Sequence, residues 1–454
     1  MIRPALPALA LTLAVSSLSA QTQGLPDVSQ KFGNSPNVKL VSHVQLAEYG
    51  AVTDLEIEQE LSRPYAYVAR RFDQPGFAII SLKDPQRAHV IYNWHIENPE
   101  IHEGRAGMDA QYFKTKGRYY YVQAMQFGNT GPDWDLGAVI TDVTSLPDTS
   151  KIREAGRIRE PESPNGFHNT LMYKHSDGRA LLFATSGAMA KVYDMDKFLG
   201  GDAKQGRIGQ VPVLNAPNGR GTYHDFSAQY DPVTKQDKFY GAAWESGFYI
   251  FDITKPEEPK LITQITGHSG AGNSHTFTPT PDGRYAVVES EYQYAPLKIF
   301  DLKPGLDGTV QNVSRPVGAW NADWRALSHN HEVRWPYVFV SGYEDGLQIF
   351  NMMDPTNPYT VGYYYTCGCP HRSGVTFRGP ARPPNSGGVD NGAWGVDVRN
   401  ADGLIVISDK VTGFWAFKME GFDGWNGHQW GLPNISSAQD WDNGPEGAPK
   451  NKVS

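Results

Sequence analysis

The chain has no excess of positive charge. Lysine and arginine together number 41 against 49 aspartate and glutamate residues, which gives a formal net charge of −8. Because a basic stripe is the minimum that a nucleic-acid-binding surface needs, this balance argues against a nucleic-acid partner. After the N-terminal segment, no stretch is apolar over the length that crosses a bilayer, and none has the periodicity of a long helix.

Several common catalytic motifs are missing as well. The sequence contains no Gly-rich phosphate loop, no Gly-x-Ser-x-Gly and no His-Glu-x-x-His. Any functional site therefore has to be sought among residues that are far apart in the sequence and that the fold brings together.

The first twenty residues have the composition of a secretion signal. Arg3 precedes an apolar run over residues 5–15, and small residues follow up to Ala20. This pattern predicts a signal peptide over residues 1–20, cleaved after Ala20, and a periplasmic or secreted protein. The residue directly after the predicted cleavage site is not a cysteine, so we expect no lipid anchor and no membrane anchor after cleavage.

One short phrase recurs along the chain: a small residue, an apolar strand, and then often Asp or Asn. The copies begin roughly 50 to 65 residues apart, lie between turn-rich segments, and occupy residues 76–82, 137–143, 190–195, 247–253, 296–302, 346–352 and 413–419. Strand repeats of this kind are typical of a β-propeller, in which stacked blades share a core. We predict an all-β, seven-bladed β-propeller over residues 38–420 and an irregular C-terminal tail over residues 421–454.

The last repeat lacks an outer strand after residue 419, whereas the strand-like segment 38–44 has no repeat in front of it. We therefore expect this N-terminal strand to complete the seventh blade, which would close the ring and remove an exposed sheet edge.

Histidines recur where the innermost strands of the repeats begin. The seven openings are aligned as Thr53-Asp54, Met108-Asp109, His168-Asn169, His224-Asp225, His275-Thr276, His331-Glu332 and Trp394-Gly395. Equivalent positions of a propeller converge on its axis, and imidazole is a common ligand of transition metals. We predict a metal site at one mouth of the channel, formed by His168, His224, His275 and His331 and completed or oriented by Asp225 and Glu332. Copper, zinc, iron and manganese all fit.

Other interpretations of the histidines stay open. Each could make a structural hydrogen bond at the start of its blade, or the set could reflect duplication alone. His329 could replace His331 as the ligand, Asp54 and Asp109 could complete the ring, and His102 could reach in from a loop.

The two cysteines, Cys367 and Cys369, are separated by one glycine. An exported protein favours a disulfide between an even pair, yet a ring closed across one residue is strained. The alternatives are a Cys-x-Cys-x-His half-site for copper or zinc that includes His371, and two incidental thiols.

The chain resembles the bacterial LVIVD-repeat proteins and the related choice-of-anchor B proteins. The resemblance lies in segments 247–259 and 346–358 and in the openings around His168, His224 and His331, and it extends over roughly residues 38–420. It implies an exported propeller and no particular activity, because that family has no single established one. Repeats three and five lack its Asp-Pro turn. Copper-dependent methanethiol oxidases and seven-bladed polysaccharide lyases are similar in architecture only.

Three functions are compatible with these patterns. The first is an exported metal-binding propeller, and a metal-dependent oxidoreductase or lyase if a coordination position stays open to a small molecule or oligosaccharide at the channel mouth. The second is a non-catalytic scaffold that recognises a protein or a polysaccharide. The third is a lyase for acidic sugars, in which Tyr223 and His224 would be the catalytic pair.

Overall fold

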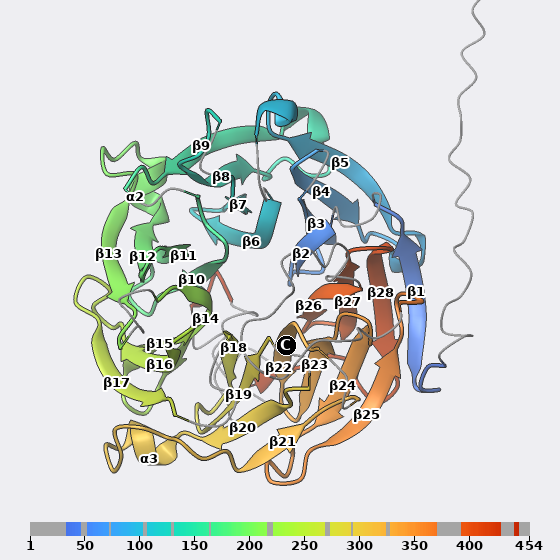
Figure 1. Cartoon of the computed structure of the whole chain (residues 1–454). Helices are drawn as coiled ribbons and strands as arrows, with labels where there is room; N and C mark the ends of the chain where they lie inside the picture. The colour runs from blue at the N-terminus through green and yellow to red at the C-terminus, as the bar shows by residue number, and fades with distance from the viewer. Residues whose placement is uncertain are drawn as a thin grey trace, which may run out of the picture.

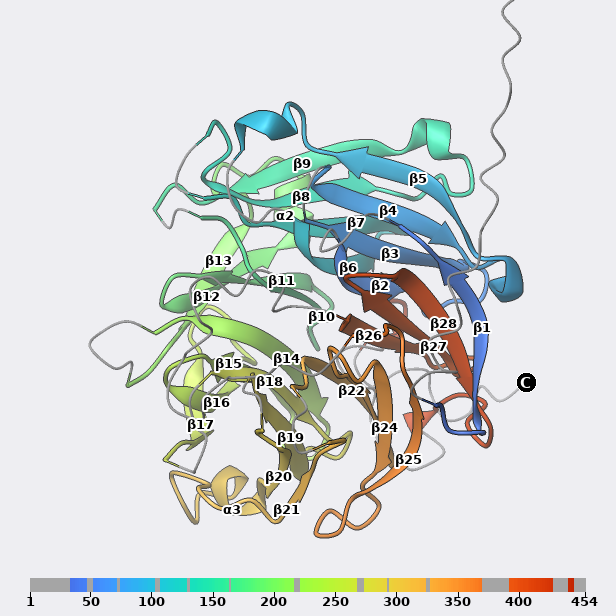
Figure 2. The same cartoon turned by 45° about the vertical axis from the view of Figure 1, so that its right-hand side comes forward.

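The computed structural model is a closed ring of seven four-stranded antiparallel sheets, seen end-on in Figure 1 and tilted in Figure 2. This confirms the predicted seven-bladed β-propeller. The structure describes residues 33–46, 52–71, 74–102, 107–128, 131–162, 165–215, 221–267, 273–291, 294–323, 327–369, 392–427 and 440–444. The predicted signal peptide, His371 and most of the predicted tail lie outside these residues.

Each blade is a meander that runs from the channel outward. Blade one consists of β2 (Val52–Ile57), β3 (Tyr65–Arg70), β4 (Gly76–Ser81) and β5 (His89–His95), and blade two of β6 (Gly107–Thr115), β7 (Arg118–Met125), β8 (Leu136–Asp142) and β9 (Arg153–Arg159). Blade three consists of β10 (Thr170–Lys174), β11 (Ala180–Ser186), β12 (Met189–Asp194) and β13 (Arg207–Pro212), and blade four of β14 (Tyr223–Asp231), β15 (Gln236–Ala243), β16 (Gly247–Asp252) and β17 (Lys260–Ile265). Blade five consists of β18 (Ser274–Pro279), β19 (Tyr285–Ser290), β20 (Leu297–Asp301) and β21 (Gly318–Trp320), and blade six of β22 (Asn330–Arg334), β23 (Tyr337–Ser341), β24 (Leu347–Asn351) and β25 (Tyr359–Tyr364). Blade seven consists of β26 (Ala393–Arg399), β27 (Leu404–Asp409), β28 (Gly413–Met419) and β1 (Val38–Val44).

Helical segments in the described residues are short. They are α2 (Met195–Leu199), α3 (Lys303–Leu306) and the 3-10 turns η1 (Pro85–Arg87), η2 (Pro99–Ile101) and η3 (Thr149–Lys151). No helix among these residues is both long enough and apolar enough to cross a bilayer.

The core lies between neighbouring blades. Two of the middle strands, β4 and β11, are buried along their whole length, because each sheet is covered on both faces. The outer strands instead alternate, and β17 exposes its first residues and buries Ile265. Between blades three and four, Phe183 and Phe239 lie 5.4 Å apart between ring centroids. Each apolar interface of this kind depends on both of its blades, so the ring is stable only as a whole.

Strand β1 closes the ring, as predicted. It pairs antiparallel with β28, with Val38 opposite Met419 and Val44 opposite Phe414. Val38 is fully buried, and the His43 ring stacks on Trp415 with 4.0 Å between centroids. The two ends of the propeller are therefore held in one sheet, beside each other in Figure 1.

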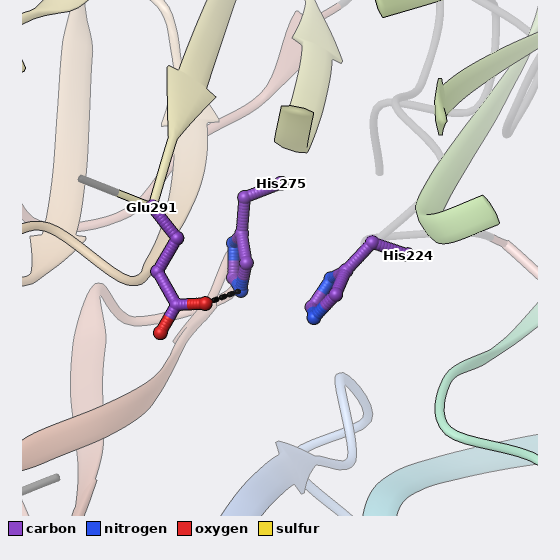
Figure 3. A group of neighbouring side chains, drawn as sticks. All are labelled: His224, His275 and Glu291. Carbon is purple, nitrogen blue, oxygen red and sulfur yellow. Dashed lines mark ion pairs between the residues drawn. The ribbon is translucent and has the colours of Figure 1, made fainter. Parts of the chain in front are cut away.

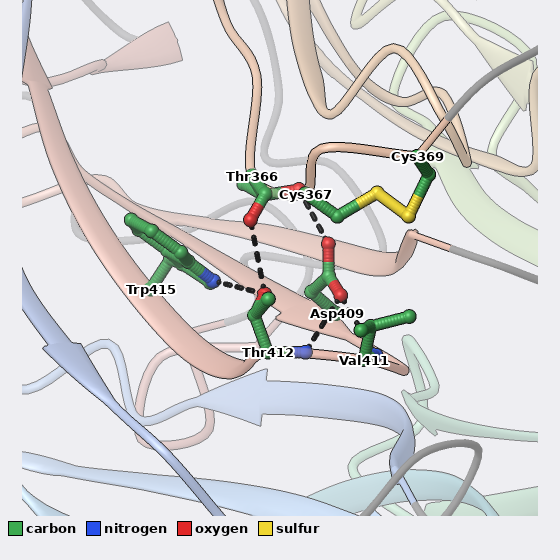
Figure 4. The surroundings of a disulfide bond; sticks show 7 residues. All are labelled: Thr366, Cys367, Cys369, Asp409, Val411, Thr412 and Trp415. Atoms are coloured by element: carbon green, nitrogen blue, oxygen red, sulfur yellow. Dashed lines mark hydrogen bonds between the residues drawn. A yellow bond between two sulfur atoms is a disulfide. The ribbon is translucent and has the colours of Figure 1, made fainter. Parts of the chain in front are cut away.

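The two cysteines form a disulfide with each other. The sequence alone had argued against this bond, because a ring closed across one residue is strained. Cys367 is bonded to Cys369, with 5.2 Å between their Cα atoms. The bridge follows Thr366, whose hydroxyl donates to Asp409 (2.5 Å) at the end of β27 (Figure 4). Because both thiols are in the disulfide, this structure does not present them as the predicted metal half-site.

Part of the C-terminal segment packs on blade two. The ring of Trp441 lies 6.3 Å from that of Phe113, and Lys114 Nζ lies 2.7 Å from an Asp442 carboxylate oxygen. These contacts hold Trp441 and Asp442 against β6, the innermost strand of blade two.

The innermost strands line the channel with carboxyl groups. One cavity in the channel is bordered by the carboxyl groups of six residues: Asp54, Glu56, Asp109, Asp225, Glu332 and Asp397. Arg334, which is fully buried, offsets two of them: it lies 2.7 Å from Glu332 and 3.5 Å from Asp397. Burial, and next the Glu332 charge, raise the pKa of Asp397 to about 7. At neutral pH this carboxyl is therefore partly protonated.

We predict that removal of β1 opens the ring. A chain that starts after Val44 should unfold at a clearly lower temperature and lose several kcal/mol of the ~5–15 kcal/mol typical of a domain, because β28 becomes an exposed edge. Differential scanning calorimetry measures this, with a chain that starts at Gly33 as the control. Equal melting temperatures for the two chains would contradict the role of β1 in closure.

We also predict that Asp397 makes folding more favourable in acid. Between its ordinary pKa of 3.8 and the folded value of about 7, the folded state binds a proton that the unfolded state lacks. Its contribution is thus full below pH 3.8 and is lost as the pH rises through 7. The side chain at position 397 stays neutral at every pH in the variant Asp397→Asn. The free energy of unfolding of the wild type minus that of this variant should therefore fall as the pH rises, by up to about 1.4 kcal/mol per pH unit.

Urea unfolding at pH 5, 6, 7 and 8 measures this difference. Asp423→Asn changes an exposed carboxyl and serves as the control, with a pH dependence like that of the wild type. If Asp397→Asn and the wild type have parallel pH profiles, Asp397 does not hold the extra proton.

Candidate functional site

Four histidines from consecutive blades lie next to one another at one mouth of the channel. His168 precedes β10, His224 and His275 lie near the starts of β14 and β18, and His329 precedes β22. The Nε2 atoms of His168 and His224 are 2.9 Å apart. Ring centroids are 4.0 Å apart for His224 and His275 and 4.5 Å apart for His275 and His329. The structure thus brings together three of the predicted ligands.

The fourth position belongs to His329, whereas the sequence alignment assigned it to His331. Asn330 is the first residue of β22 and pairs with Ser341, and the His329 backbone N–H donates to the Ser341 carbonyl (2.9 Å). His331 pairs with Val340 one step farther along the strand and borders the channel cavity. The dipeptide His329-Asn330 repeats His168-Asn169 and was the available signal, and the sequence analysis had kept His329 as the alternative to His331.

Asp225 and Glu332 border the channel cavity together with His331. Among the described residues, neither belongs to the group of donor atoms that His224 and His275 form at the mouth. Burial, and next the Asp109 charge, raise the pKa of Asp225 to about 7, and burial lowers the pKa of His331 to about 3.

Two glutamates that the sequence analysis missed supply the carboxylates at the mouth. Glu289 is in β19 and Glu291 follows it, and both are buried. His275 Nδ1 lies 2.8 Å from Glu289, and His275 Nε2 lies 4.0 Å from Glu291. One nitrogen each of His224 and His275 and one oxygen of Glu291 all lie within 4.8 Å of one another (Figure 3). We call His224, His275 and Glu291 the three-donor core.

Hydrogen bonds orient this group from outside. Tyr343 is fully buried, and its hydroxyl donates to Glu291 (2.7 Å). His329 Nδ1 lies 2.7 Å from the Trp394 carbonyl, and His168 Nδ1 lies 3.0 Å from the Gln126 side-chain oxygen. A ring nitrogen that faces an acceptor carries the hydrogen, so Nε2 of both imidazoles keeps its lone pair.

Burial disfavours the protonated form of one imidazole at the mouth, that of His329. It lowers the pKa of His329 well below its usual value, against the opposing effect of the Trp394 carbonyl. Burial, and next the Asp225 charge, raise the pKa of Glu289 well above its usual value. His275 Nδ1 lies 2.8 Å from this carboxyl and 2.9 Å from the Thr276 hydroxyl, in a site where ionised carboxylates are costly.

A cavity of about 400 Å³ opens beside the histidines. His168, His224, Glu291 and His329 face it, and Trp244 and Trp394 form aromatic walls. His224 stacks on Trp244 with 4.9 Å between centroids. The cavity gives a small molecule access to the three-donor core.

The two residues of the predicted catalytic pair, Tyr223 and His224, have different partners. Tyr223 borders the cavity, but its hydroxyl donates to the Pro212 carbonyl (2.9 Å) and burial raises its pKa well above the usual value. His224 instead turns toward His168 and His275. Of the open alternatives, His102 lies 3.5 Å from Asp133 and stacks on Phe127.

Known proteins match this chain in fold alone. No family model and no curated protein sequence matches it. The structure is similar to that of Raptor from Chaetomium thermophilum, with a TM-score of 0.55 and 10% identity, covering 86% of this chain and 30% of that one. It is also similar to the β-propeller domain of Cps50 (Swd1) from Myceliophteria thermophila, with a TM-score of 0.53 and 11% identity, covering 84% of this chain and 99% of that domain. At such identities these similarities establish a β-propeller.

Proposed function

We propose that this propeller binds one divalent transition-metal ion at the mouth of its channel. The observation that carries the proposal is the three-donor core, in which two imidazoles and one carboxylate from blades four and five lie within 4.8 Å of one another. Two histidines and a glutamate are a known ligand set for zinc and for non-haem iron, and they leave coordination positions open.

The surroundings of the core support a metal. Metal-binding histidines usually donate their second ring nitrogen to a carboxylate or a carbonyl, and Glu289 is in that place for His275. Tyr343 holds Glu291 in the same way. A divalent cation would also favour the ionised forms of the buried glutamates Glu289 and Glu291.

The cavity supports a role beyond structure. A bound ion would supply Lewis-acid or redox chemistry, with copper, zinc, iron and manganese as candidates. His224 and Glu291 face the cavity and would hold the ion next to a small molecule or the end of an oligosaccharide. The secretion signal predicted over residues 1–20 and the resemblance to LVIVD-repeat proteins would place this site outside the cytoplasm.

We predict that the purified wild-type protein, reconstituted if necessary, carries about one equivalent of a transition metal. His224→Asn/His275→Asn should lose it while staying folded, because two of the three donors are gone. Elemental analysis measures the metal, and circular dichroism and the melting temperature check the fold.

Two matched variants sharpen this test. His89→Asn changes an exposed histidine of β5 and should keep the full metal content. His331→Asn removes the histidine that the sequence alignment had favoured and should also keep it. Absence of metal in the wild type, even after reconstitution with each candidate, would contradict the metal site and favour a non-catalytic scaffold that binds a protein or polysaccharide.

We predict that Glu289→Gln weakens metal binding by roughly 10–100-fold, the usual effect of removing a carboxylate that supports a histidine ligand. The amide keeps the shape of the side chain but accepts the His275 Nδ1 hydrogen less strongly. Competition with a chelator measures the affinity, and Glu162→Gln on the surface is the control. Equal affinities for all three proteins would show that Glu289 does not support a ligand.

A further inference from the structure

We propose that the disulfide between Cys367 and Cys369 is a site of thiol–disulfide exchange, which a small thiol opens in the folded protein by attack on Cys369. The proposed metal site makes no use of this bridge. Two features of the bridge carry the inference: the bond adds little to the stability of the fold, and its two ends differ in their access to solvent.

The bond closes a very short loop. Its cysteines are two positions apart, and both follow β25, so the bond connects no blade to another. A disulfide stabilises a fold mainly by removing entropy from the unfolded chain, and that entropy grows with the length of the closed loop. Two residues so close in sequence stay close in the unfolded chain as well. The bond therefore restricts the unfolded chain little.

Other contacts hold the chain in place directly before the bridge. Tyr364 pairs with Leu347 at the end of β25. The buried hydroxyl of Thr366 donates to Asp409, and the Thr412 hydroxyl donates to the Thr366 carbonyl (3.1 Å). None of these contacts involves a sulfur atom (Figure 4). The chain around the bridge therefore keeps these contacts when the bond is open.

The two ends of the bridge differ in exposure. Cys367 is 1% exposed, whereas Gly368 is exposed and Cys369 is half-buried. In thiol–disulfide exchange a thiolate must reach one sulfur atom, and the other sulfur atom leaves. The exposures point to Cys369 as the attacked end and Cys367 as the leaving end. Because a buried cysteine behaves as a small apolar residue, the Cys367 thiol can stay in its place after the bond opens.

The exchange is balanced over two steps. A thiolate attacks Cys369 Sγ and forms a new S–S bond with it, and Cys367 Sγ leaves with the electron pair of the old bond and takes up a proton. A second thiol attacks the mixed disulfide and releases the Cys369 thiol together with the disulfide of the small thiol. The protein thus gains two electrons and two protons, and two small thiols are oxidised.

Reduction of the native wild-type protein is the first test. The protein is incubated with millimolar reduced glutathione, quenched with acid, unfolded and alkylated, and its intact mass counts the free thiols. We expect two alkylated thiols, and a melting temperature of the reduced protein within about 2 °C of that of the untreated protein. A bond that opens only after the chain is unfolded in urea, or a larger fall in melting temperature on reduction, would overturn the proposal.

Two matched variants test which sulfur atom is attacked. Cys367→Ala leaves the accessible thiol, and Cys369→Ala leaves the buried one. With oxidised glutathione, Cys367→Ala should form the mixed disulfide at least about tenfold faster than Cys369→Ala, because exchange needs an accessible thiolate. Circular dichroism checks that both variants are folded, and equal rates in the folded variants would overturn attack at Cys369. If either variant does not fold, the reduction of the wild type alone decides.

Discussion

The pairing of β1 with β28 is the constraint on which the site depends. The imidazoles of neighbouring blades meet one another only across the ring, because each stands at the start of a different sheet, whereas Glu289 reaches His275 within one sheet. His224 meets His275 only because β14 and β18 stand side by side around a common axis. That axis exists once Val38 and its neighbours join the last blade to the first segment of the chain. Closure of the ring, apolar packing between blades and convergence of the histidines therefore depend on one another.

The electrostatics of the mouth follow from the same geometry. Inner-strand residues that are equivalent in the repeats must meet near the axis, whether they are imidazoles or carboxyls. Imidazoles tolerate this by staying neutral, as burial makes His329 do. Carboxylates repel one another, so they need protons, a cation or a buried partner such as Arg334. At Glu289 and Glu291, beside the imidazoles, the proposed metal ion would be the cation that satisfies both kinds of group.

The repeat phrase was enough to predict the fold, because blade number and strand order follow from spacing and turn chemistry. His168, His224 and His275 could be found for the same reason, since each opens its blade at an equivalent position. His329 was harder: β22 begins at Asn330, one residue before His331, and such a shift does not change the phrase that marks the repeat. Only the pairing of Asn330 with Ser341 sets the register. Glu289 and Glu291 carry no repeat signal at all. They lie at the end of a second strand and reach His275 through sheet register, which sequence spacing does not encode. The disulfide depended on local backbone geometry between Cys367 and Cys369, which composition could not supply.

Ligand chemistry distinguishes the mouth from the channel below it. The channel carboxyls of Asp225 and Asp397 have pKa values raised to about 7, so protons compete there for the oxygen atoms that a hard cation would need. The mouth instead offers nitrogen donors, with His329 kept from protonation by its burial. Nitrogen ligands prefer the later transition metals, whose affinities exceed those of manganese at such sites. A single axis therefore carries two groups of opposite character. In blades three, four and six a histidine is followed by an amide or a carboxyl (His168-Asn169, His224-Asp225 and His329-Asn330). These histidines border the cavity at the mouth, and the residues that follow them border the cavity in the channel.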